Sequence, residues 1–183
     1  MYSQRNLEIT SSLLRKEKYG SLLWVIDRTV TAMGARKLKK WLERPLLTQS
    51  LIEKRLDLVN GFYEQFFERE EIREALQSIY DMERLSGRVS FGNVNARDLI
   101  QLKRSLAKVP YIKEQLKQFD SKAVQALSDR MDPLPELYEL LENSIAKDPP
   151  ISITEGKLLK DGYNQELDQY RDASRNGKHW IAE

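Results

Sequence analysis

Cysteine is absent from the 183 residues, histidine occurs once, and glycine and proline number only 8 and 6. Without cysteine the chain has no disulfide and no thiolate ligand, and the reducing cytoplasm is the expected compartment. The few glycines and prolines leave little room for many tight turns, which argues against an all-β fold. Long apolar runs are also missing, so we expect neither a signal peptide nor a membrane-spanning helix.

The sequence also lacks the motifs of common nucleotide and metal sites. It contains no G-x-x-x-x-G-K-[ST] phosphate loop and no G-x-G-x-x-G motif. One histidine and no cysteine leave zinc sites and His-activated nucleophiles without their usual groups. Glu68, Glu70 and Glu71 alternate with cations in a way typical of a solvated helix face. We therefore expect no catalytic residue, no cofactor site and no metal site, and the chain is not expected to be an enzyme.

Charge is abundant but nearly balanced, with 30 basic and 28 acidic side chains and a net charge of +2. This balance disfavours a free-standing nucleic-acid module, because phosphate neutralisation supplies much of the affinity of such proteins. A local basic run surrounds Trp41. It is either a phosphate-contacting surface or a solvated face whose lysine and arginine stems cover apolar side chains.

Apolar periodicity predicts a mainly α, multi-helical domain. Thr31 is predicted to cap a helix that carries Leu38, Trp41 and Leu42 inward. Residues 52–66 repeat apolar side chains at steps of three and four, which predicts a second helix with one stripe facing a core. Further helix starts are predicted at Asp81 and at Asn95, where Asp98 has capping-box spacing.

Three segments are predicted to depart from this pattern. "QRNLEIT" alternates enough to predict a short strand. "SLLWVID" is expected to be buried in either conformation. "KDPPISITEGKLLKDG" is predicted to form a small β-hairpin around Glu155 and Gly156. In addition, Gly34 in the first turn of its helix predicts that a neighbouring backbone passes close to it.

From Tyr163 onward, apolar or small residues recur at steps of three and four, which predicts a helix beginning near Asn164 with a seam for a second helix. Three basic residues on this helix are candidate contacts to a DNA backbone: Arg171, Arg175 and Lys178. Because Asp168 and Asp172 lie among them, intrahelical ion pairs are the alternative.

Several motifs resemble the core domain of the bacterial mismatch-repair MutS family. "SLLWVIDRTVTAMGARKLKKWLERPL" is similar to the opening of that domain, and "RNLEIT", "DMERLSGRV", "NARDLIQL" and "KDGYNQELDQYR" match later family segments in the same order. Candidate structural or interdomain residues in the first motif are Asp27, Arg28, Thr29, Thr31, Gly34, Arg36 and Trp41. Asp27 and Arg28 lie between apolar segments, where either a fold-stabilising ion pair or a contact to a neighbouring domain is expected.

The resemblance implies a division of the chain into two parts. Residues 1–162 are expected to be the first segment of a helical core domain, and residues 163–183 the start of a truncated long lever helix that ascends toward an absent clamp. The implied role is a structural link between the ATPase end and the DNA clamp of a longer protein. That protein is expected to bind ATP and Mg²⁺ and to act on mismatched duplex DNA through its remaining domains. It is also expected to form a homodimer and not to associate with a membrane.

The alternative to this role is an independent helical adaptor that binds a partner helix through its C-terminal seam. Either role is that of a binding or structural protein.

Overall fold

The chain folds into α-helices joined by loops. The computed structural model describes the backbone of residues 2–182 and the side chains of residues 4–177, so the side chain of Lys178 lies outside the described residues. In chain order the elements are α1 (Tyr2–Asn6), α2 (Leu22–Ile26), α3 (Ala32–Glu43), α4 (Gln49–Glu64), α5 (Phe66–Gln77), α6 (Met82–Ser90), α7 (Ala96–Leu106), α8 (Val109–Lys117), α9 (Lys122–Asp129), α10 (Pro135–Ser144), the 3₁₀ turn η1 (Ile153–Glu155) and α11 (Gln165–Ala182). This confirms the predicted mainly α fold.

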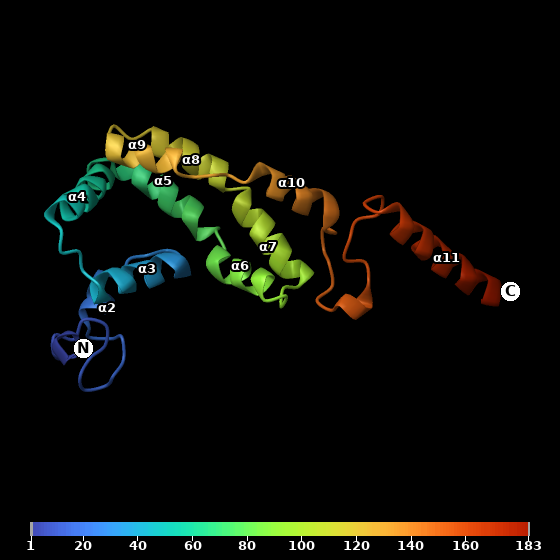
Figure 1. The fold of residues 1–183 in the computed structure, drawn as a ribbon, viewed down its shortest axis with the longest axis horizontal. Helices are drawn as coiled ribbons and strands as arrows, with labels where there is room; N and C mark the ends of the chain where they lie inside the picture. The colour runs from blue at the N-terminus through green and yellow to red at the C-terminus, as the bar shows by residue number, and fades with distance from the viewer. Residues whose placement is uncertain (1, 183) are drawn as a thin grey trace.

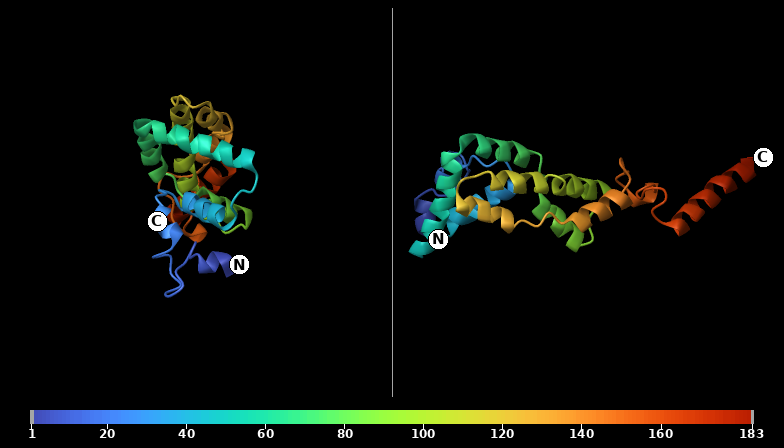
Figure 2. Two further views of the ribbon diagram at one scale, coloured as in Figure 1. Left: turned by 90° about the vertical axis from the view of Figure 1, so that its left-hand side faces the viewer. Right: turned by 90° about the horizontal axis from the view of Figure 1, so that it is seen from above.

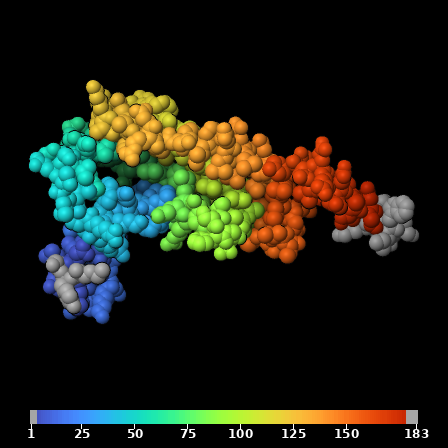
Figure 3. Space-filling model, viewed as in Figure 1, coloured from blue at the N-terminus to red at the C-terminus, as the bar shows by residue number. Residues whose placement is uncertain are grey.

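The helices form an elongated molecule (Figure 1). Helices α4, α5, α8 and α9 pack together at one end, where α8 contacts both α5 and α9. Helices α6, α7 and α10 form the middle. Helix α11 projects from the other end, and the view from above shows the same extension (Figure 2). The N-terminal residues form a separate lobe below α2 (Figure 3).

Polar side chains begin several helices where the sequence predicted them. Thr31 Oγ1 accepts a hydrogen bond from the Gly34 amide at 3.0 Å. The side chain of Asp81 caps α6. Asn95 and Asp98 form a reciprocal capping box at the start of α7. These side chains satisfy backbone amides that have no partner within the first turn of a helix.

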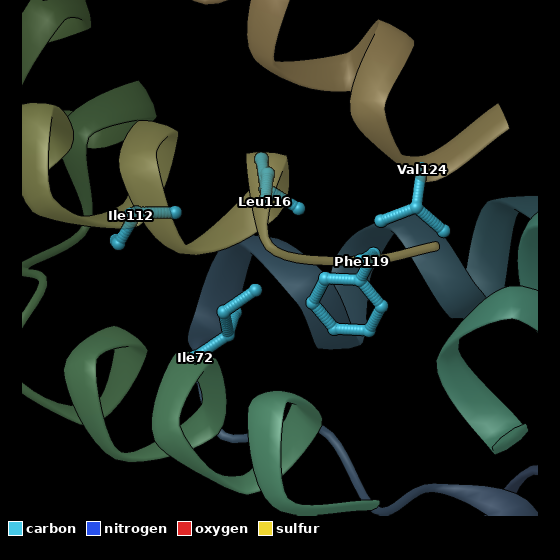
Figure 4. Close-up of a cluster of buried hydrophobic side chains, with 5 residues drawn as sticks. All are labelled: Ile72, Ile112, Leu116, Phe119 and Val124. Atoms are coloured by element: carbon cyan, nitrogen blue, oxygen red, sulfur yellow. The ribbon is translucent and has the colours of Figure 1, made fainter. Parts of the chain in front are cut away.

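One hydrophobic cluster holds the α4–α5–α8–α9 end together (Figure 4). Ile72 of α5, Ile112 and Leu116 of α8, and Val124 of α9 surround Phe119, which lies in the loop between α8 and α9. Phe119 is 1% exposed and Val124 is fully buried. Fully burying side chains of this size contributes roughly 1.5–3 kcal/mol each, so this cluster is the principal core of that end.

A glycine permits the closest helix crossing in this end of the molecule. A Cβ atom on Gly61 of α4 would lie 2.6 Å from Ser121 Cβ and 2.8 Å from Val124 Cγ2. Next to the crossing, Phe62 packs edge-to-face on Phe119 with ring centroids 5.0 Å apart. Only a residue without a side chain lets α4 approach α9 this closely.

A second cluster holds the middle of the molecule. It joins α7 to α10 and consists of Ala96, Ile100, Leu106, Leu141 and Ile145. Leu158 and Leu159 pack against it from the segment that precedes α11. The second cluster therefore fixes the position of that segment relative to α10.

The predicted hairpin is wrong, and the strand predicted at the N-terminus is wrong as well. Residues 2–182 contain no β-strand, and Tyr2–Asn6 forms the short helix α1. Within the hairpin segment, Ser152 and Glu155 cap one another around a 3₁₀ turn. Leu159 instead forms an isolated antiparallel bridge with Ile145 at the end of α10. Burial of Leu158 and Leu159 against the second cluster favours this pairing over a local hairpin.

Two predictions of burial are also wrong. In "SLLWVID", Ser21 and Leu23 are buried, but Trp24, Val25 and Ile26 are all exposed. The stripe of Ile52, Leu56, Val59 and Tyr63 on α4, followed by Phe66 at the start of α5, is exposed too, by 38–76%. These five residues are called the α4 stripe below. The helix that carries it runs as predicted to Glu64, but it is interrupted at Gln65 before Phe66, and no described part of the chain covers the stripe.

Candidate functional site

The loop between α2 and α3 is organised by Asp27. Its carboxylate accepts hydrogen bonds from the Thr29 hydroxyl at 2.6 Å and the Thr29 amide at 3.1 Å, and it forms an ion pair with Lys18. The Lys18 ammonium, followed by the Thr29 hydroxyl, lowers the pKa of Asp27 to about 2. Hydrogen bonds to the charged form of a carboxylate favour that form. Asp27 therefore links Lys18 to the loop that precedes α3.

Arg28 does not pair with the carboxylate beside it. Its guanidinium donates to the backbone oxygen of Asp27 at 3.2 Å and is exposed. Its own backbone oxygen accepts a hydrogen bond of 3.0 Å from Arg73 of α5. The side chain of Arg28 remains accessible for a contact outside this chain.

Gly34 is crowded by side chains from the preceding loop and not by a crossing backbone. A Cβ on Gly34 would lie 3.0 Å from Thr31 Oγ1 and 3.4 Å from Thr29 Cβ. The predicted close approach is therefore present, but its source differs from the prediction. Gly34 leaves room for the Thr31 cap and for the Thr29 side chain that holds Asp27.

Arg36 joins α3 to the first turn of α6. Its Nη1 and Nη2 atoms donate to the two carboxylate oxygens of Asp81 at 2.7 Å each, and its Nε donates to Glu83 at 2.9 Å. The hydrogen bonds from Arg36 lower the pKa of the Asp81 carboxyl. In turn Asp81 and, to a lesser extent, Glu83 raise the pKa of the Arg36 guanidinium. A bidentate arginine–carboxylate pair of this kind fixes both the distance and the orientation of the two side chains. Since Asp81 also caps α6, one carboxylate both begins that helix and attaches it to α3.

Trp41 lies under a second arginine and does not point into the core. The guanidinium carbon of Arg55 is 3.7 Å from the centre of the Trp41 ring, while Lys37 Nζ is 5.8 Å away. Leu38 and Leu42 of the same helix are half-buried, whereas Trp41 is 38% exposed. The cation stacked on the ring links α3 to α4.

Arg171 anchors α11 at its base. Its guanidinium donates to Asp161 at 2.9 Å, to Asp168 at 3.1 Å and to the backbone oxygen of Leu159 at 3.0 Å. Only 17% of its side chain is exposed. Of the three candidate DNA contacts, Arg171 is thus engaged within the chain, Arg175 is exposed, and Lys178 lies outside the described side chains.

The segment before α11 is in turn attached to α10 and α7. Glu142 of α10 forms ion pairs with Lys160 at 3.2 Å and with Lys103 of α7 at 2.7 Å. Lys103, followed by Lys160, lowers the pKa of Glu142. At the other end of α7, Asp98 pairs with Arg88 of α6 at 2.6 Å. Sequence reasoning missed these pairs, since charges alternating along helices do not reveal which distant partner each one meets.

These pairs form a series of polar contacts along the molecule, which is called the ion-pair series below. From the C-terminal end, it runs through Arg171, Lys160–Glu142–Lys103, Asp98–Arg88 and Asp81–Arg36. Arg171 holds α11 to the segment before it, and Glu142 joins that segment, through Lys160, to α10 and α7. The Asp98–Arg88 pair joins α7 to α6, and the Asp81–Arg36 pair joins α6 to α3.

Among the described residues, no group of three or more His, Cys, Asp or Glu side chains is arranged to hold a metal ion. The sequence has no phosphate loop either. No helix within residues 2–182 has both the length and the apolar character needed to cross a membrane.

The sequence profile of MutS domain III matches residues 3–176. The chain belongs to the MutS domain III family. It is 60% identical to the DNA mismatch repair protein MutS of Oceanobacillus iheyensis over 183 residues. The proteins of the same name from Geobacillus sp. and Bacillus subtilis are each 54% identical, over 183 and 182 residues.

Each match covers the whole chain but 21% of the relative, so this MutS domain III chain spans about a fifth of the length of the curated relatives it matches. The resemblance stated from the five motifs is confirmed. The family membership also explains why the motif residues Asp27, Gly34 and Arg36 occur together: in the structure they build the joint between α2, α3 and α6.

Proposed function

We propose that this MutS domain III chain is the mechanical link of a DNA mismatch-repair ATPase. In this proposal it transmits movement between the ATPase end of the longer protein and a DNA clamp reached by α11. The observation that carries the proposal is the ion-pair series, because it joins the base of α11 to α3 through successive packed helices. A link of this kind needs two arrangements whose balance both ends influence.

Two uncovered apolar surfaces support a role within a larger assembly. Helix α2 exposes Trp24, Val25 and Ile26, and the α4 stripe is exposed along its whole length. Contiguous exposed apolar side chains are typical of interaction sites in soluble proteins. We propose that further domains of the longer protein cover both surfaces.

The remaining activities are assigned by this proposal to other parts of the longer protein. ATP, Mg²⁺ and mismatch reading belong there, as does formation of a homodimer in the cytoplasm. Within the chain, Arg175 is the proposed contact to the DNA backbone, because its side chain is exposed on α11 while Arg171 is engaged at the base.

A segment exchange tests the proposal. Residues 1–183 replace the matching segment in the DNA mismatch repair protein MutS of Bacillus subtilis, which is 54% identical over 182 residues. We expect the exchanged protein to retain the host's preference for mismatched duplex and its response to ATP on DNA. A folded exchange protein that binds mismatched DNA but has lost the response to ATP contradicts the proposal.

The adaptor alternative has one observation in its favour. Tyr163 and Tyr170 of the C-terminal seam are 44% and 66% exposed, so a partner helix has access to them. The same exposure suits a lever helix whose neighbour lies in another part of a longer protein. The 21% share of each relative favours the second explanation.

A further inference from the structure

A basic groove runs along one face of α7, on residues other than those of the ion-pair series. A hollow of about 510 Å³ and another of about 240 Å³ share Tyr80 and Arg104 in their walls. Lys108 lines the larger one, and Arg97 and Lys147 line the smaller one. The two hollows are therefore neighbours on one surface, bounded by the α5–α6 junction and by the chain that follows α10.

Three of these cations share one face of the helix. Arg97, Arg104 and Lys108 follow one another at steps of seven and four residues, which places them in a row. Ala107 and Lys108 keep right-handed helical dihedral angles in the turn between α7 and α8. At 1.5 Å per residue the row spans roughly 16 Å.

These cations form no direct ion pair with the side chains of residues 4–177, although Lys108 also lines a neighbouring hollow of about 490 Å³ with Glu71 and Glu74. None of Arg104, Lys108 and Lys147 forms an ion pair or a side-chain hydrogen bond with a side chain in residues 4–177, and all three are exposed. Arg97 uses only its Nε, which donates to the backbone oxygen of Pro149 at 3.2 Å. Asp148 is the acidic residue of the smaller hollow. The other lysines and arginines of α6 and α7, Arg84, Arg88 and Lys103, are each paired with a carboxylate.

We propose that this groove binds single-stranded nucleic acid. A row of cations roughly 16 Å long is long enough to contact several successive phosphates of one strand. Tyr80 lies between the two hollows and is 38% exposed, so it offers a ring on which a base stacks. A basic groove combined with an aromatic platform is the general arrangement for binding single strands without sequence preference.

The low net charge of the chain limits the affinity. Binding is therefore expected to be weak and strongly dependent on salt. The proposal does not depend on the mechanical role proposed above, because neither α11 nor the ion-pair series takes part in it.

The test uses the whole chain and a fluorescein-labelled oligothymidylate, with anisotropy measured over a range of salt concentrations. The groove variant carries Arg104→Gln, Lys108→Gln and Lys147→Gln. The matched control carries Lys40→Gln, Lys54→Gln and Lys122→Gln, three exposed lysines away from the groove. Both variants lower the net charge by three, so a difference between them reports position and not total charge.

We expect the groove variant to bind about tenfold more weakly, with the slope of log affinity against log salt reduced by about 2, since each phosphate contact contributes about 0.7. The control should lose less than about twofold. Tyr80→Leu should weaken binding about tenfold while Tyr80→Phe does not, because stacking needs the ring and not the hydroxyl.

Two results overturn the proposal. Equal losses in the groove and control variants mean that the oligonucleotide is held by diffuse charge. Displacement by tripolyphosphate as effective as by unlabelled oligothymidylate at equal phosphate concentration means that the groove binds anions and not nucleic acid. Unchanged thermal midpoints in all variants ensure that loss of fold does not imitate loss of binding.

Discussion

At the residue scale, the titration of Asp27 predicts how stability depends on pH. The folded-state pKa of about 2 lies below the ordinary value of 3.8. Because the shift is downward, its stabilisation is present above the unfolded pKa and is lost as pH falls from about 4 toward 2. Asp27→Asn should therefore be less stable than the parent at neutral pH, and the difference should vanish near pH 2.

Urea midpoints of both proteins from neutral to acidic pH measure this difference. Glu155→Gln, a change of an exposed carboxylate in the η1 turn, is the control. A gap between parent and Asp27→Asn that stays constant down to pH 2 would show that the Lys18 and Thr29 contacts do not act through the charge of Asp27.

Two helical glycines give a matched pair of substitutions. A methyl group on Gly61 meets Ser121 and Val124 at 2.6–2.8 Å, whereas one on Gly87 of α6 meets nothing within 4 Å. Both gain about 1 kcal/mol of helix propensity as alanine. Overpacking costs about 1–3 kcal/mol, so Gly61→Ala should be net destabilising and Gly87→Ala stabilising. Equal urea midpoints for the two variants would contradict the close crossing of α4 and α9.

The sequence identified the residues of the first motif as candidates, but it did not show which residues they contact. Resemblance singled out Asp27, Gly34 and Arg36, and the Thr31 cap followed from its position before a helix. Their partners Lys18, Asp81 and Glu83 did not follow. Asp81 and Glu83 lie more than forty positions from Arg36, and the turn that brings Lys18 to Asp27 nine positions later has no motif in the sequence. Gly61 was missed for the same reason: a glycine within a helix gives no sign of which helix crosses it.

At the element scale, helix starts were predictable because caps are local. Asp81, Asn95 and Thr31 each satisfy amides within three residues of themselves. The hairpin prediction failed because the conformation of that segment depends on distant residues. Packing of Leu158 and Leu159 on α10 stabilises the segment more than pairing with the residues before it would. Periodicity likewise identified the α4 stripe but not whether its partner lies in this chain.

Helix α11 is predicted to weaken along its length. Its first turns are held by Arg171 and by Asn164, whose side chain accepts from the Leu167 amide at 2.9 Å. Beyond Ser174 the described side chains are exposed, and Asn176 and Gly177 are poor helix formers. An isolated helix of this length is marginal in water.

Hydrogen exchange measures this directly. In dilute protein, amide protection should fall from Ser174 onward, and Gly177→Ala should extend it because a Cβ there meets nothing within 4 Å. Protection of the last turns that rises with protein concentration would show packing of the seam against a second copy. Strong, concentration-independent protection throughout α11 would contradict a helix held only at its base.

At the scale of the whole molecule, a substitution in the exposed α4 stripe distinguishes the stability of the isolated chain from packing against further domains of a larger protein. Leu56 is 59% exposed, so Leu56→Glu should change the stability of the isolated chain by no more than about 0.5 kcal/mol. In the exchange protein with Bacillus subtilis MutS, the same change should lower the thermal midpoint, because a charge then replaces a leucine in a covered surface.

Lys54→Glu is the matched control, since it introduces the same side chain two residues away on a different face of α4. It should leave both proteins unchanged. If Leu56→Glu destabilises neither protein, the stripe is not covered by further domains, and the proposed assembly is wrong at this surface.

The central claim is that movement passes between α11 and the rest of the chain, and Arg171→Gln in the exchange protein tests it most directly. The measurement is the rate at which ATP releases the protein from mismatched duplex, with Arg130→Gln, an exposed arginine without a described ion pair among residues 4–177, as control. The account predicts unchanged ATP hydrolysis and DNA binding but markedly slower release for Arg171→Gln alone. Equal release rates for the two variants would contradict it.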